Sequence, residues 1–334
     1  MHSDEQLDAK EGSSTGDELR ALVQRATSAF AIPADEEHLF ASLTEAVARI
    51  GQPFNETGEV LRANIDGLIS AVSIPYTLAN RSALDRHWQR IYSTARIRSL
   101  KLTAGPDETS EALDSRRERD ALARAKPDMD SFVRSPEGRD ALIGDTLGFL
   151  ERLLSNESLS EAANELILQG LVLCWGAFEV LARDCFIEHL NVNPSRALIL
   201  LEDSVAKRRF ELSKISLETL ATHNFDLSAR MGTLLAQQQD LSDVYSVKAV
   251  YQALFSSDDE LRNALNDSDL RLLSLRRNLI VHRRGIIDAT YAAATNCSQR
   301  IGERLKLTPD QLEAHLRTVI KTATGILYAV SAVR

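Results

Sequence analysis

The sequence predicts an all-α protein, and three observations lead to that prediction. Apolar residues recur at three- and four-residue steps over most of the chain, which is the spacing of one helix face. No segment shows convincing apolar–polar alternation, the pattern of a half-buried strand. Pro, Gly and Asn fall between several of the periodic segments, where they indicate turns. We therefore expect a succession of helices and no β-sheet.

The first part of the chain is expected to contain four helices after a polar tail. Residues 1–16 are acidic and polar, so we expect them to be disordered, and they lack the basic and apolar segments of a signal peptide. Apolar residues then repeat with helical spacing in residues 17–30, 35–50, 61–72 and 82–102. Pro75 is expected to close the third of these helices.

A charged stretch and two proline segments follow. Residues 106–126 are typical of a solvated helix with ion pairs between residues four apart. Pro127 and Pro136 interrupt the pattern, which indicates a domain boundary near this region. We accordingly divide the chain into an N-terminal helical region, residues 17–130, and a second helical domain, residues 131–334.

The second domain is expected to be built around one long helix. Residues 160–190 are apolar around most of the helix circumference, which is typical of a central helix rather than a surface helix or a membrane span. Residues 196–239 suggest an insertion of short helices. Further helices are expected over residues 142–154, 241–255, 267–285 and after Pro309.

Composition limits the function. The formal net charge of −9 argues against a general nucleic-acid coat protein, so any contact with nucleic acid must be local. The three cysteines are widely spaced and form no CxxC pair, which fits a reducing, cytoplasmic environment. The histidines other than His282 show no metal-ligand spacing, and phosphate-binding and nucleophile-elbow motifs are missing from the sequence.

One segment concentrates groups suited to chemistry. Residues 276–285 contain one histidine and four arginines, and no Asp or Glu occurs between Asp269 and Asp288. A group that titrates near neutrality among fixed positive charges suits acid–base work on a phosphodiester, and it equally suits simple anion binding. The candidate residues are Arg276, Arg277, Asn278, His282, Arg283 and Arg284.

Helical geometry separates two of these residues. On a helix over residues 270–282, Arg277 falls within an apolar stripe that includes Val281, so it should have an acidic partner or an anionic ligand. Arg277 and His282 are about 140° apart around the axis. They converge only if the helix unwinds near His282, or if a second subunit supplies another copy of the segment. Glu179 either pairs with Arg183 on the helix surface or holds Arg277 from the core.

This segment resembles the R-x(4–6)-H motif of HEPN domains. Arg277 and His282 fit the motif, and Asn278 matches the polar residue often found after the arginine. Residues 284–288 and the upstream helix with Trp175, Phe178 and Glu179 are also similar to the ribonuclease-like HEPN group. The resemblance covers about residues 138–334. Some HEPN toxins carry a tyrosine two residues after the histidine, and Arg284 stands there instead, so regulation through such a tyrosine is not expected.

The resemblance implies a helical domain that dimerises through its motif helices and cleaves RNA without metal or cofactor. His282 would be the acid–base group, Arg277 would hold the phosphate, and Asn278 would orient His282 or the substrate. Glu179, Arg276, Arg283 and Arg284 would support the site. The family includes toxins and antiviral effectors, and the N-terminal helices are expected to regulate, for instance through a protein partner. The competing hypothesis is a non-catalytic helical protein that binds RNA or acts as an adaptor.

Overall fold

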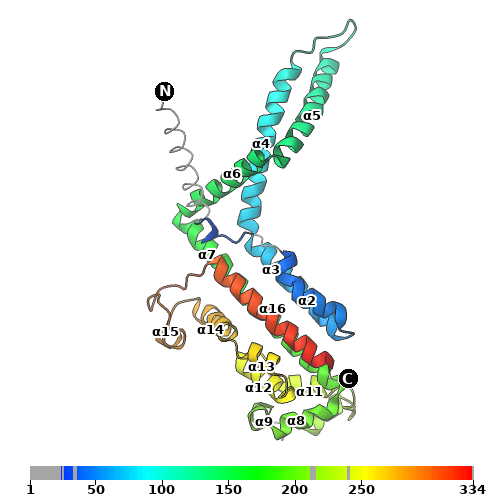
Figure 1. The fold of residues 1–334 in the computed structure, drawn as a ribbon, viewed down its shortest axis with the longest axis vertical. Coiled ribbons are helices and arrows are strands. Elements are labelled where there is room, and N and C mark those ends of the chain that lie inside the picture. Colours follow the sequence, from blue (N-terminus) through cyan, green and yellow to red (C-terminus); the bar gives the residue numbers. More distant parts are fainter. Residues whose placement is uncertain (1–23, 25, 33–35, 211–215, 239–240, 333–334) are drawn as a thin grey trace, which may run out of the picture. The chain divides into compact units, whose positions relative to one another are not determined.

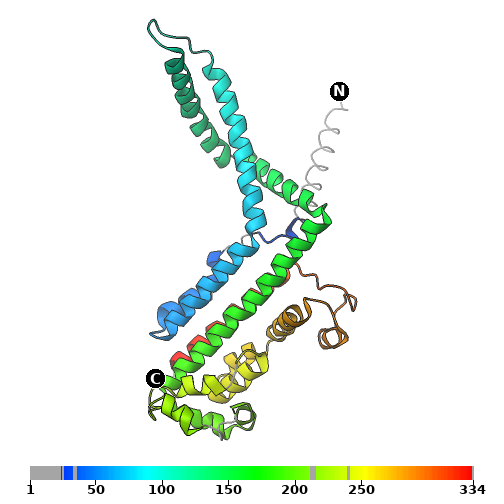
Figure 2. The same cartoon turned by 180° about the vertical axis from the view of Figure 1, so that it is seen from behind.

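The computed structural model describes residues 24, 26–32, 36–210, 216–238 and 241–332. The prediction of an all-α fold is confirmed: 79% of the described residues are helical, and these residues contain no strand beyond an isolated bridge between Ile286 and Arg304. Figures 1 and 2 show the helices from opposite sides. The predicted disordered tail, residues 1–16, lies outside the described residues.

Two compact units make up the chain, and both are discontinuous in sequence. Unit 1 comprises residues 1–32 and 73–163, and unit 2 comprises residues 33–72 and 164–334. This division differs from the predicted one near residue 130. The reason is that α2 (Glu36–Arg49) and α3 (Phe54–Val72) pack on the C-terminal helix α16 (Pro309–Ala332), so they belong with the second half of the chain.

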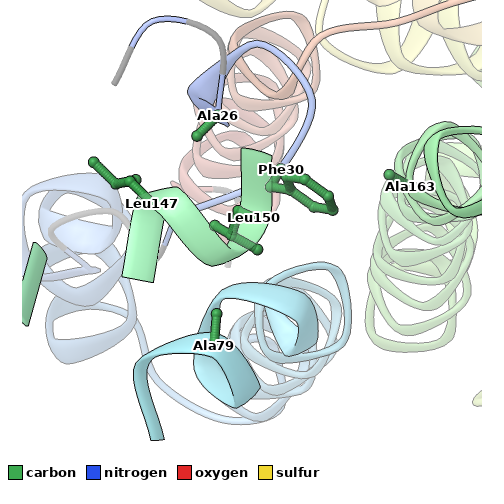
Figure 3. Close-up of a cluster of buried hydrophobic side chains, with 6 residues drawn as sticks. All are labelled: Ala26, Phe30, Ala79, Leu147, Leu150 and Ala163. Carbon is green, nitrogen blue, oxygen red and sulfur yellow. The ribbon is translucent and has the colours of Figure 1, made fainter. Parts of the chain in front are cut away.

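Unit 1 is organised around α4 (Ile74–Ser99), which packs against α5 (Ser110–Arg134) and α6 (Pro136–Leu154). Pro75 lies in the first turn of α4, where its missing N–H costs nothing, so it opens this helix instead of closing the one before. Figure 3 shows one small core of this unit, formed by Ala26, Phe30, Ala79, Leu147, Leu150 and Ala163. A second core joins α4 to α5 through Ala95, Ala121 and Ala125.

The helix α5 continues through Pro127, so the expected interruption there is wrong. A proline in a helix interior removes one backbone hydrogen bond and costs about 3 kcal/mol. Contacts on both sides of Pro127 offset this cost. Ala121 and Ala125 pack on α4 before it, and after it Phe132 stacks on the His87 ring at 4.6 Å. The charged face of α5 is solvated, as the sequence predicts. Two of its arginines also form hydrogen bonds with the loop that precedes the helix.

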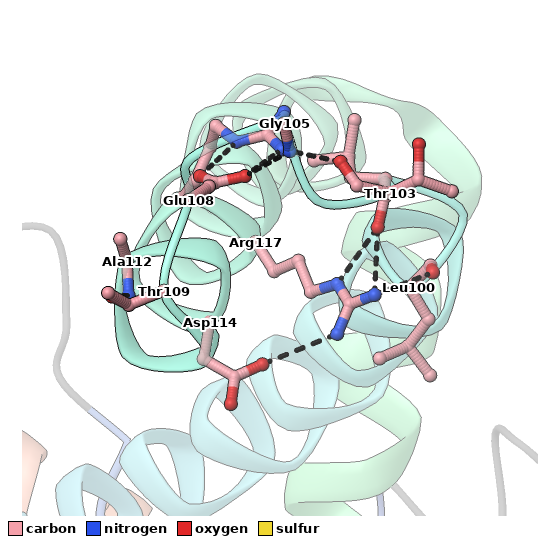
Figure 4. Close-up of polar contacts among 10 residues, drawn as sticks. Leu100, Thr103, Gly105, Glu108, Thr109, Ala112, Asp114 and Arg117 are labelled. Atoms are coloured by element: carbon pink, nitrogen blue, oxygen red, sulfur yellow. Dashed lines mark hydrogen bonds and ion pairs between the residues drawn. The ribbon is translucent and has the colours of Figure 1, made fainter.

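Arginines of α5 fasten the loop that joins it to α4 (Figure 4). Arg117 donates to the carbonyl oxygens of Leu102 at 2.8 Å and Leu100 at 3.4 Å, which are left unpaired at the end of α4. Arg116 donates to Glu108 at 2.7 Å and to the Thr103 carbonyl at 2.7 Å. The hydrogen bond from Arg116, followed by one from the Gly105 amide, holds the pKa of the Glu108 carboxyl below its usual value.

Unit 2 contains most of the long helix α7 (Glu157–Val192), with α16 lying along it in both views (Figures 1 and 2). The helices approach closely at Gly170: a β-carbon there would lie 3.0 Å from Leu312 of α16 and 2.7 Å from Val72 of α3. By length and composition α7 passes the test for a membrane span, but 56% of its most apolar window is buried inside the protein. That burial agrees with the expected central helix.

Short helices cover the C-terminal end of α7, as the sequence suggested for this stretch. They are η1 (Pro194–Arg196), α8 (Ala197–Glu202), α9 (Ser204–Phe210), α10 (Leu217–Thr222) and α11 (Met231–Gln238). The remaining helices are α12 (Val244–Leu254), α13 (Asp259–Leu265), α14 (Ser268–Arg283) and α15 (Ala289–Thr295). Tyr251 of α12 ties this group to α7 by donating to the buried Ala182 carbonyl at 2.6 Å.

Candidate functional site

The candidate residues lie on α14, whose ends are well defined. Asp267 caps its N-terminus by accepting a hydrogen bond from the Asp269 amide at 2.9 Å. At the other end Arg284 adopts the left-handed conformation with φ 54°, and the Gly285 amide donates to the Leu279 carbonyl. His282 therefore lies in the last helical turn, where a cation is stabilised by the helix dipole.

The packing of α14 fixes which of its faces is covered. Leu270, Leu273, Leu279 and Ile280 are buried. Two contacts show that α14 runs antiparallel to α7: Arg277 faces Glu179, and Gly285 lies beside Leu168, where a β-carbon would be 3.6 Å from the Leu168 methyl. Val281, which the sequence places in the same apolar stripe as Arg277, is 48% exposed in the single chain.

Arg277 is held by a small polar network between the two helices. Its Nη2 lies 3.8 Å from Glu179 Oε2, and its Nη1 donates to Asn278 Oδ1 at 3.1 Å. Trp175 in turn donates its indole N–H to the same Glu179 oxygen at 3.1 Å and to the Ser242 carbonyl at 3.2 Å. Of the two roles expected for Glu179, the structure contains the pairing with Arg277.

His282 is exposed, and the helix remains regular through it to Arg283. The unwinding that would bring His282 toward Arg277 within one chain is therefore not seen. The hydrogen bond recorded for the Asn278 side chain within the described part of the chain involves Arg277, not His282. The single chain thus brings Arg277, Asn278 and Glu179 together and leaves His282 separate.

The neighbouring arginines point in different directions. Arg276 turns toward α16, where its Nη1 donates to His315 Nε2 at 2.8 Å. Burial, followed by the Arg276 charge, lowers the pKa of His315 to about 4, so the ring is neutral and accepts this bond. Arg283 and Arg284 are exposed beside His282, and Arg283 lies 3.9 Å from Asp288. Arg276 therefore joins two helices, and the other two arginines give the exposed end of α14 its positive charge.

An exposed apolar strip, which the sequence did not reveal, borders Arg277. On α7 the side chains of Leu173 and Val180 are 52% and 41% exposed, and Gly176 between them faces open space. On α14, Val281 lies one helical turn after Arg277 and is also exposed. Since α7 is apolar around most of its circumference, its sequence pattern does not distinguish this strip from the buried faces.

No family model, no curated protein and no solved structure matches this chain. Among the described residues, no group of three His, Cys, Asp or Glu side chains has an arrangement that would hold a metal ion.

Proposed function

We propose that the chain is a homodimeric endoribonuclease of the HEPN class, in which two copies of α14 form one RNA-cleaving site. The observation that supports this most directly is the contrast between two residues of the motif. Arg277 is three-quarters buried and oriented by Glu179, whereas His282 stands exposed in the last turn of the same helix. A phosphate-holding group needs a fixed position, and a proton-transferring group must reach solvent and substrate.

The exposed apolar strip supports assembly from two subunits. Leu173 and Val180 are exposed on α7, the helix whose Glu179 faces Arg277, and Val281 is exposed one helical turn after Arg277 on α14. A twofold axis through this strip would bury it against its own copy and place two His282 and two Arg277 side chains around one groove. Because α14 is unbroken, a second copy is the remaining way for these two groups to converge.

The proposed reaction needs only groups that this segment offers. One His282 accepts the proton of the RNA 2′-hydroxyl while the 2′-oxygen attacks the adjacent phosphorus. Arg277 offsets the charge that develops on the phosphate oxygens. The bond to the 5′-oxygen breaks, that oxygen takes a proton from the second His282, and the products are a 2′,3′-cyclic phosphate and a 5′-hydroxyl. Positioned proton transfer of this kind contributes roughly 10²–10⁴-fold to rate.

The decisive experiment follows RNA cleavage by the purified full chain in the presence of EDTA. We expect cleavage with cyclic-phosphate ends, and we expect His282→Ala to abolish it without changing the circular dichroism spectrum. His38→Ala is the matched control, because His38 is also an exposed histidine on a helix. Cleavage that persists in His282→Ala would overturn the proposal.

A second candidate function is favoured by the contacts of Arg277 itself. Its guanidinium already has a carboxylate and an amide as partners, which is the arrangement of a structural arginine. In that case α14 would belong to a non-catalytic dimer that binds RNA or another protein. RNA binding without any product ends, unchanged in His282→Ala, would favour this second function.

A further inference from the structure

We propose that the exposed face of α4 in unit 1 is a binding surface for the RNA phosphate backbone. The choice of RNA as the partner rests on the function proposed above, but the surface itself is a property of unit 1. It consists of Arg86, Arg90, Arg98 and Lys101, together with Ser93 and Ile97, and we call it the α4 basic face.

The first reason for proposing this binding surface is the charge of α4. The helix contains five arginines and a single acidic residue, Asp85, in a chain whose formal net charge is −9. Asp85 pairs with Arg81, with the Arg81 Nε at 3.4 Å from the carboxylate. No acidic residue follows in α4, so the positive charge lies over the part of the helix beyond Asp85. Such a local concentration is what contact with a polyanion requires of an acidic protein.

The second reason for proposing this surface is the position of its arginines around the helix. At about 100° per residue, Arg86, Arg90 and Ile97 fall within about 40° of one another around the helix. Ala95 and Ser99, on the opposite side, pack against α5, where Ser99 donates to Asp120 at 2.8 Å. Arg98 and Lys101 flank the face at its far end. Arg86, Arg90, Arg98 and Lys101 are all exposed, and within the described ranges no ion pair is recorded for them.

The arginines of α5 provide the contrast. Residues 116–119 hold the most conspicuous basic cluster of unit 1 in the sequence, but Arg116 and Arg117 are engaged with Glu108, Asp114 and the carbonyls of the loop (Figure 4). Arg124 is likewise held by Asp120 at 2.8 Å. Two of the three arginines in that cluster are therefore already engaged, with Arg119 as its exposed member. Among the described residues Arg86, Arg90 and Arg98 of α4 form no ion pair, and Arg86 donates to the Ser82 hydroxyl at 2.9 Å.

The spacing along α4 fits a strand of phosphates. Arg86 and Arg90 are about 6 Å apart along the axis, and Arg90 and Arg98 about 12 Å, so the side chains reach successive phosphates of an extended strand. Ser93 adds an exposed hydroxyl between them. A helix that lies on a membrane needs a broad apolar face, whereas this face offers only Ile97 and the adjacent Leu100. RNA is therefore the better fit.

The test measures binding of a fluorescein-labelled single-stranded RNA to the full chain by fluorescence anisotropy, over a range of salt concentrations. The background is His282→Ala, so that cleavage does not interfere. We expect Arg86→Gln/Arg90→Gln/Arg98→Gln to bind about tenfold or more weakly than its parent. The slope of log affinity against log salt should become shallower by about 2, since each single-strand phosphate contact contributes about 0.7.

A control variant removes the same charge from arginines that are already paired. Arg81, Arg124 and Arg317 lie in exposed ion pairs with Asp85, Asp120 and Glu313, and their replacement by Gln should leave the salt slope unchanged. Both triple variants should keep the parent circular dichroism spectrum. An equal loss of affinity in both variants, or no loss in the first, would overturn the α4 basic face as an RNA site.

Two further outcomes separate this inference from the nuclease proposal. If the first triple variant loses binding to phosphatidylserine vesicles but not to RNA, the partner is a membrane surface and the inference is wrong. If His282→Ala still cleaves RNA while the α4 variant binds RNA weakly, the nuclease assignment of His282 fails and the α4 basic face stands.

Discussion

Arg277 of α14 and Glu179 of α7 face each other across a helix pair, with Nη2 and Oε2 3.8 Å apart and each side chain about one quarter exposed. Glu179 also accepts the indole N–H of the almost fully buried Trp175. A single carboxylate thus orients the arginine of the motif and satisfies a tryptophan of the core, which links the candidate site to the stability of unit 2.

We predict that Glu179→Ala lowers the free energy of unfolding by about 1–3 kcal/mol, because it leaves a largely buried guanidinium without its counter-ion. Glu179→Gln, which keeps an acceptor for Trp175, should lose less. Urea unfolding followed by tryptophan fluorescence measures both. As a control, Glu45→Ala removes the partner of Arg49 in an exposed pair, and should cost less than about 1 kcal/mol. Equal effects at Glu45 and Glu179 would contradict the role given to Glu179.

Assembly through the apolar strip predicts a monomeric variant. Leu173→Asp/Val281→Asp places two charges on side chains that are about half exposed in the single chain, so folding should be little affected. In a twofold interface the same charges would face each other or apolar groups. We expect light scattering after gel filtration to show a dimer for the parent chain and a monomer for the variant, with RNA cleavage lost as well. Leu217→Asp, at another exposed leucine, should leave the dimer intact.

The buried His315 predicts a specific dependence of stability on pH. Its pKa is about 4 in the folded chain and about 6.5 when unfolded, so below pH 6.5 the unfolded state binds more protons. The stability associated with neutral His315 is therefore fully present above about pH 6.5 and is lost as pH falls toward 4, with an expected loss on the order of 2–3 kcal/mol.

His315→Gln provides the matching variant, because its amide oxygen can accept from Arg276 without titrating. The difference in unfolding free energy between parent and variant should change between pH 6.5 and 4 and stay constant above pH 7. A constant difference for His315→Gln over the whole range would show that the ring does not titrate as stated.

The contact between α11 and α7 predicts a sharp penalty at one glycine. A β-carbon at Gly232 would lie 2.0 Å from the Ile187 carbonyl oxygen, so Gly232→Ala must push α11 away from the backbone of α7. We expect a loss of several kcal/mol in unfolding free energy, measured by urea denaturation. Gly67→Ala in α3 meets nothing within 4 Å and should instead stabilise by up to about 1 kcal/mol. If Gly232→Ala left the unfolding free energy unchanged, α11 and α7 would be less closely packed than the structure shows.

Local patterns in the sequence were sufficient to predict the fold class and most helices. The final helix starts at Pro309 as expected, and the motif helix begins after Asp267 and ends near Gly285. The continuation of α5 through Pro127 and the unit boundaries were not predictable, because they depend on contacts between residues far apart in sequence. Phe132 reaches His87, and α2 and α3 pack on α16; no local pattern indicates either contact.

The candidate site was predictable in part. The apolar surroundings of Arg277 in sequence indicated a buried guanidinium with an acidic partner, and Glu179 occupies that place. The different orientation of Arg276 depends on His315, which lies on another helix, and the pattern of α14 alone does not indicate that Val281 is exposed. Periodicity within one helix reports its faces, but not which neighbour covers each face.

The discontinuous build of unit 2 changes how the protein should be taken apart. Trimming the chain from its front end, the usual route to an isolated C-terminal fragment, would strip α2 and α3 from α16 and uncover the residues beneath them. Excising residues 73–163 and bridging the gap with a short flexible linker would instead keep every segment of unit 2 on one polypeptide. That internal deletion is the form in which the α14 motif should be crystallised or assayed alone.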